Sequence, residues 1–152
     1  MSAGDEWAFF VPAADWDPGT AKTPAGYLTG NAKDYRFLSS NQARRIHHQT
    51  RAKIARAWRH AAKEAACLHV PGLILNRARI IVRFVKDDNR SYDPGNLYPI
   101  AKPIVDGLVD ARILEDDDHT RLIGPDPRHG GNDTKRPGVW VRIVDMEGVR
   151  HD

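Results

Sequence analysis

Hydrophobic and polar positions alternate in three parts of the chain, and this pattern predicts a strand in each. The three segments are Trp7–Val11, Ala78–Lys86 and Val139–Val144, all rich in aromatic or β-branched residues. A shorter apolar run at Arg121–Ile123 predicts a fourth strand. Residues 124–138, between the last two strands, contain many Gly and Pro residues and predict an irregular loop.

Two further segments have apolar residues at three- and four-residue spacing, which is typical of a helix with one buried face. The longer segment, Ser40–Leu68, predicts a long amphipathic helix that begins at a serine cap, Ser39 or Ser40. The shorter one, Ile104–Ala111, predicts a second helix with Pro103 in its first turn, where a missing N–H costs little.

The order strand, helix, strand, helix, strand, strand indicates an α+β domain with a small mixed sheet, one long basic helix and one shorter helix. A chain of 152 residues has the size of one domain. We therefore expect residues 1–152 to form a single domain, with a long loop at about residues 13–38 and a short flexible C-terminus. Hydrophobic residues make up 41% of the chain, which is enough to form a core.

The cysteine and hydropathy content indicates a cytoplasmic protein. Cys67 is the only cysteine, so no internal disulfide can form. No apolar run approaches the roughly 20 residues of a membrane span, and acidic residues stand where a secretory signal would be basic. We expect no membrane association and no small-molecule cofactor.

The net charge of +3 is modest, but the basic residues are concentrated in the predicted long helix, where Glu64 is the one acid. Such a surface can neutralise backbone phosphates of nucleic acid, whatever the base sequence. The alternative is a helix that carries basic side chains for solubility alone. The candidate phosphate-binding residues are Arg44, Arg45, Arg51, Lys53, Arg56 and Arg59.

Acidic residues bracket the second helix, and several carboxylates in one place require a cation. Asp93 precedes this helix, and Asp116 to Asp118 follow it. Carboxylate oxygens suit Mg²⁺ or Mn²⁺, which can assist phosphodiester hydrolysis. Lys102 stands four residues before Asp106, so in a helix the two share a face. Spacing alone leaves open that these acids are only solvated turns and the Lys102–Asp106 pair a weak surface ion pair.

The segment SYDPGNLYPIAKPIVDGLVDARILEDDDHTRLIG resembles the signature of RusA-type Holliday junction resolvases, the crossover junction endodeoxyribonucleases of bacteria and their phages. That signature has an Asp-x-Asp-Asn turn, a lysine, a helix with an aspartate, and a Glu-Asp-Asp turn. The resemblance covers about a quarter of the chain. It implies metal-binding roles for Asp93 and Asp117, with Asp116 beside Asp117, a catalytic role for Lys102, and matches at Asn96 and Asp106.

The resemblance implies a Mg²⁺-dependent endonuclease that resolves four-way junctions as a homodimer, in a bacterial or phage-infected cell. The sequence departs from the signature in two places. Gly95 stands where the family has its second aspartate, and Tyr98–Ile100 looks like an insertion. Two alternatives therefore stay open: a protein of the same fold that binds branched DNA without cutting it, and an unrelated small nucleic-acid-binding protein.

Overall fold

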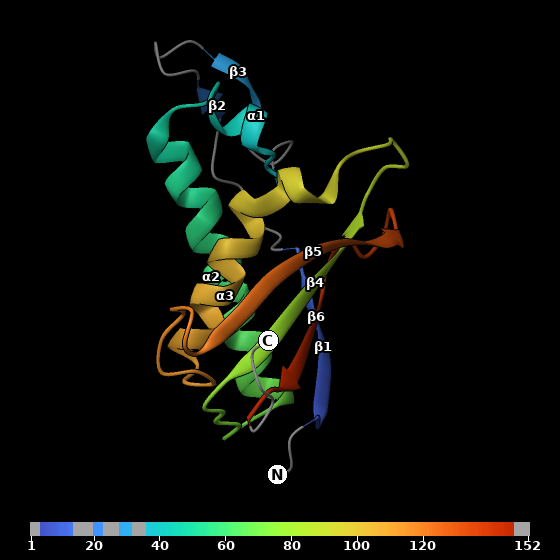
Figure 1. Ribbon diagram of the computed structural model, residues 1–152. Helices are drawn as coiled ribbons and strands as arrows, with labels where there is room; N and C mark the ends of the chain where they lie inside the picture. The colour runs from blue at the N-terminus through green and yellow to red at the C-terminus, as the bar shows by residue number, and fades with distance from the viewer. Residues whose placement is uncertain (1–3, 14–19, 23–27, 32–35, 148–152) are drawn as a thin grey trace.

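The computed structural model has a four-stranded sheet at its centre (Figure 1). Its strands are β1 (Glu6–Pro12), β4 (Ala78–Lys86), β5 (Leu122–Asn132) and β6 (Gly138–Asp145), in the spatial order β1-β6-β4-β5. β6 pairs antiparallel with both β1 and β4, whereas β5 runs parallel to β4. The predicted α+β class with a mixed sheet is confirmed.

Two helices, α2 (His48–His69) and α3 (Tyr98–Asp110), cover one face of this sheet (Figure 1). Their apolar sides and the inner face of the sheet enclose the core, in which Trp58, Phe84 and Ile104 are each at most 2% exposed. Burial of such side chains is the main stabilising contribution to a fold of this size. No helix among the described residues is long and apolar enough to cross a membrane.

The long helix predicted over Ser40–Leu68 is interrupted, and the prediction was wrong at this point. A one-turn helix, α1 (Ser40–Ala43), begins at Ser39, which forms a capping box. The imidazole of His47 then accepts a hydrogen bond from the first turn of α2 and so starts a new helix. Ile46, in the connecting turn, is only 1% exposed. Two local caps and one buried side chain therefore outweigh continuous helical periodicity.

Two predictions about proline-rich segments were also wrong. Residues 124–138 were expected to be a loop, but β5 continues to Asn132. β5 tolerates its prolines because it is an edge strand that pairs only with β4. Pro103 lies inside α3, and Pro99 occupies the first turn instead. The hydrogen bond that Pro103 cannot donate would have gone to Pro99, at the start of the helix, so little is lost.

The predicted long loop at residues 13–38 contains a small second sheet. The strands β2 (Thr20–Lys22) and β3 (Leu28–Asn31) pair antiparallel. Strands of three and four residues are too short to show alternation in the sequence. The predicted flexible C-terminus, residues 148–152, lies outside the part of the chain that the structure describes, which comprises residues 4–13, 20–22, 28–31 and 36–147.

Candidate active site

Lys102 lies on α3 between two carboxylates. Its ammonium group donates a hydrogen bond to Asp106 Oδ1 at 2.9 Å, one helical turn further along, and a second to Asp117 Oδ2 in the turn after the helix. The three side chains are 38%, 30% and 29% exposed, respectively. The predicted shared face of Lys102 and Asp106 is therefore confirmed. The lysine ammonium group thus lies between two partly buried carboxylates.

The acidic turn after α3 uses its three aspartates in different ways. Asp116 accepts a hydrogen bond from the backbone N–H of Asp117 at 2.7 Å, which fixes the turn. Asp118 accepts from the hydroxyl and the backbone N–H of Thr120, and these bonds lower the pKa of its carboxyl group. Only Asp117 reaches Lys102. Asp116 and Asp118 therefore stabilise the local turn, whereas Asp117 forms an ion pair with Lys102.

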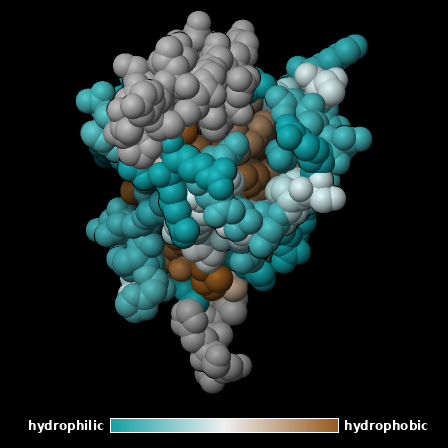
Figure 2. Space-filling view, turned by 90° about the horizontal axis from the view of Figure 1, so that it is seen from above, coloured by the Kyte–Doolittle hydropathy of each residue, from teal (hydrophilic) through white to brown (hydrophobic). Residues whose placement is uncertain are grey.

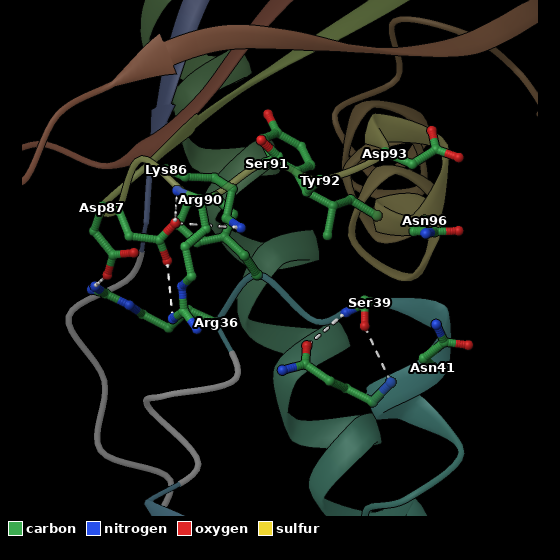
Figure 3. A pocket seen from close by; sticks show the side chains of 14 residues that line it. Arg36, Ser39, Asn41, Lys86, Asp87, Arg90, Ser91, Tyr92, Asp93 and Asn96 are labelled. Atoms are coloured by element: carbon green, nitrogen blue, oxygen red, sulfur yellow. Dashed lines mark hydrogen bonds and ion pairs between the residues drawn. The ribbon is translucent and has the colours of Figure 1, made fainter.

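Asp93 lies at the start of a short 3-10 helix, η2 (Pro94–Leu97), which leads into α3. Its Oδ1 accepts a hydrogen bond from the backbone N–H of Gly95 at 2.9 Å. Asp93 and Asn96 point in the same direction from η2 (Figure 3). Among the described residues, no group of three or more His, Cys, Asp or Glu is arranged to hold a metal ion. The ligand set of Asp93, Asp116 and Asp117 stays a prediction.

Asp93 and Asn96 line a polar pocket of about 340 Å³ at the end of β4 (Figure 3). Arg36, Lys86 and Arg90 also line this pocket. These three residues were not predicted from the sequence to be part of a site. Aspartates balance these cations, since Arg36 pairs with Asp87 at 2.9 Å and both other cations approach Asp88. The described part of the same end of the molecule is mostly hydrophilic, with hydrophobic residues visible only in recesses (Figure 2). Arg36 follows a segment without periodicity, so no pattern indicated its place.

Tyr92 forms one wall of this pocket and joins it to β5. Its hydroxyl lies 2.6 Å from His129 Nδ1, and the Lys86 ammonium lies 4.4 Å from the centre of its ring. Burial, and to a lesser degree the charge of Asp88, raise the pKa of the Tyr92 hydroxyl above its usual range. Tyr92 therefore stays a neutral hydroxyl group at physiological pH.

The basic residues of the long-helix prediction are all exposed, but one of them has an internal partner. Arg59 makes two hydrogen bonds to Asp110 on α3, of 2.6 and 2.8 Å. This pair lowers the pKa of the Asp110 carboxyl and raises that of the Arg59 guanidinium. Much of the Arg59 charge is thus neutralised within the fold. The other predicted phosphate-binding residues form no ion pair with described residues: Arg44, Arg45, Arg51, Lys53 and Arg56.

No protein-family model matches the chain, and no curated protein matches it. The geometry joins Lys102, Asp106 and Asp117 in one cluster, puts Asp93 and Asn96 at a polar pocket, and leaves basic side chains exposed along α2.

Proposed function

We propose that this protein is a Mg²⁺-dependent endonuclease that cuts four-way DNA junctions. The observation that carries the proposal is the contact of Lys102 with two carboxylates, Asp106 and Asp117, that lie 4 and 15 residues away in the chain. A lysine between acids is the arrangement that the resemblance to RusA-type resolvases leads one to expect. The exposed basic side chains of α2 provide the second support.

The carboxylates beside Lys102 fit a hard divalent cation by their chemistry. Mg²⁺ is commonly held by only one or two protein carboxylates, with water and substrate phosphate as its other ligands. Asp106 and Asp117 converge on one positive group, so they are the residues that would hold the ion. Asp93 and Asp116, the other predicted ligands, each use one carboxylate oxygen in a local turn, which leaves their second oxygen for the ion. When bound, Mg²⁺ supplies Lewis acidity to a phosphoryl oxygen.

Lys102 has the properties of a group that stabilises the reacting phosphate. Hydrolysis places additional negative charge on the phosphoryl oxygens, and preorganised donors aimed at that charge lower the barrier. An ammonium group has three N–H donors, of which two are directed to Asp106 and Asp117. The third is free to donate to a phosphoryl oxygen. The carboxylates orient the lysine for this role.

The exposed arginines and lysine of α2 are proposed to contact backbone phosphates of the junction arms. Contacts of this kind do not depend on base sequence, so they suit an enzyme that selects branched shape. A four-way junction needs two symmetry-related cuts to give nicked duplexes. We therefore include a two-fold homodimer, which supplies two equivalent sites, in the proposal.

The proposal predicts paired nicks in a labelled synthetic four-way junction that depend on Mg²⁺ or Mn²⁺ and stop in EDTA. A linear duplex of the same sequence serves as the control and should stay intact. Gly95, together with the absence of a group of three metal-ligating side chains among the described residues, favours one other candidate, a protein that binds branched DNA without cutting it. Junction binding in EDTA with no cleavage in either metal would select that candidate and contradict an endonuclease.

Gly95→Asp is expected to lower the Mg²⁺ concentration for half-maximal cleavage by roughly tenfold, because it adds a carboxylate beside Asp93. A Cβ at this position would lie 3.3 Å from Asp93 Oδ1, and the backbone there has no positive φ, so an aspartate requires only a small adjustment. Magnesium titrations of cleavage would measure the change. Gly95→Asn is the matched control, since it has nearly the same volume without the charge. Equal Mg²⁺ dependence in the two variants would contradict a metal-binding role for this turn.

A further inference from the structure

The sheet has a second face, opposite α2 and α3, that no described helix covers (Figure 1). Residues along β6 alternate between the two faces: Val139 and Val141 are buried in the core, whereas Trp140 between them is 46% exposed. An exposed tryptophan in the middle of a sheet is costly to leave in water unless something binds to it. We call this second face the outer face of the sheet.

Strand pairing places two aromatic and two basic residues in one row across the outer face. Phe10 of β1 is paired with Trp140, Trp140 with Arg83 of β4, and Arg83 with Arg128 of β5. The Phe10 and Trp140 rings meet edge to face, with centroids 5.3 Å apart. The guanidinium group of Arg136 lies 5.7 Å from the centre of the Phe10 ring. Aromatic rings thus occupy one end of the row and cations the other.

Two glycines leave room for these side chains. A Cβ on Gly138 would lie 2.5 Å from Cζ of Phe10, so the Phe10 ring fills the space that any other residue would need. A Cβ on Gly130 would lie 2.9 Å from Cβ of Arg83. The outer face therefore has small residues beside the ring and the arginine, and both of these side chains are partly exposed.

The outer face carries unbalanced positive charge. Two of its arginines are neutralised, since Arg79 pairs with Asp126 at 2.6 Å and Arg142 with Glu6 at 2.5 Å. Arg83 and Arg128 form no ion pair with any residue that the structure describes. Cations beside stacking rings on an open sheet are complementary to a chain of phosphates and unpaired bases.

We propose that the outer face of the sheet binds single-stranded DNA, with bases stacked on Trp140 and Phe10 and phosphates held by Arg83 and Arg128. The choice of DNA rather than RNA rests on the proposed function. A second copy of the chain suits this face less well, because a two-fold contact would bring together two copies of a face with the same unbalanced positive charge. Lys102 lies on α3, on the other side of the sheet, so the two sites are separate.

The test is the binding of a fluorescently labelled oligothymidylate of about 20 nucleotides, measured by fluorescence anisotropy in EDTA so that no cleavage occurs. Trp140→Ala is expected to weaken binding at least tenfold. The matched control, Ile74→Ala, removes another large exposed apolar side chain, 67% exposed, and should leave binding unchanged. Arg128→Gln should reduce the slope of log affinity against log salt by about one. This second variant tests the same face if Trp140→Ala folds poorly.

Three results would overturn the inference. The first is that Trp140→Ala binds the oligothymidylate as tightly as the unchanged protein does. The second is that the protein binds oligouridylate RNA but not the DNA. The third is that Trp140→Ala dissociates a dimer and keeps its affinity for the oligonucleotide. The outcome is independent of the proposed endonuclease activity. The binding assay uses unbranched DNA without metal, so its result does not depend on whether the protein cuts junctions. Junction cleavage, in turn, is measured separately and tests the Lys102 site.

Discussion

Lys102→Met is expected to reduce cleavage of a four-way junction at least about 100-fold while leaving junction binding within a few-fold of its original value. Methionine keeps the unbranched length of the lysine side chain and removes its charge. The reacting phosphate then loses its ammonium donor, and the removal of one preorganised donor typically costs on the order of 100- to 1,000-fold in rate. The loss should appear in the rate of cleavage rather than in affinity.

The same substitution leaves Asp106 and Asp117 facing each other without the cation between them. Neighbouring carboxylates without a cation between them repel each other. Since both side chains are about 30% exposed, water screens much of this repulsion, and the fold should persist.

Single-turnover cleavage and junction binding in EDTA would measure the two effects separately, and thermal unfolding would verify that the variant is folded. Lys102→Arg is the conservative control, because it restores the charge with a different donor geometry, and it should retain more activity than Lys102→Met. Full activity in Lys102→Met would show that the lysine only neutralises its two carboxylates.

Local patterns predicted the elements whose stability depends on neighbours along the chain. The alternation of apolar and polar residues predicted β4 and β6 as strands, and four-residue spacing predicted the shared face of Lys102 and Asp106. The wrong predictions concern segments whose secondary structure depends on contacts with residues far away in the sequence. β5 is a strand because the edge of β4 offers it hydrogen bonds, although its own composition is typical of a loop. The break before α2 depends on burial of Ile46, which no local pattern indicates.

The candidate site shows the same division. Asp116 and Asp117 are adjacent and chemically identical, yet only Asp117 reaches Lys102, because the turn after α3 points the two carboxylates apart. Arg36 comes to the pocket beside Asp93 through its ion pair with Asp87, 51 residues away. The row formed by Phe10, Trp140 and Arg83 depends on strand register, and register was not part of the sequence prediction.

Gly107→Ala is expected to lower the free energy of unfolding by about 2 kcal/mol, because α2 and α3 touch at this residue. A Cβ on Gly107 would lie 2.3 Å from the backbone oxygen of Arg59 and 2.9 Å from Cβ of Ala62. Backbone cannot rotate away as a side chain can, so the helices must separate. Overpacking of a core costs roughly 1–3 kcal/mol and occasionally more, and the better helix propensity of alanine offsets about 1 kcal/mol of it.

Chemical denaturation and thermal unfolding would measure this loss, with a decrease in melting temperature of roughly 4–8 °C for a domain of this size. Gly95→Ala is the matched control, since its Cβ would meet nothing closer than 3.3 Å, and its stability should change by less than about 0.5 kcal/mol. A second substitution, Ala62→Gly, should restore little of the stability of Gly107→Ala, because the closer obstacle is the Arg59 carbonyl. Unchanged stability in Gly107→Ala would contradict this closest approach of α3, the helix that carries Lys102, to α2.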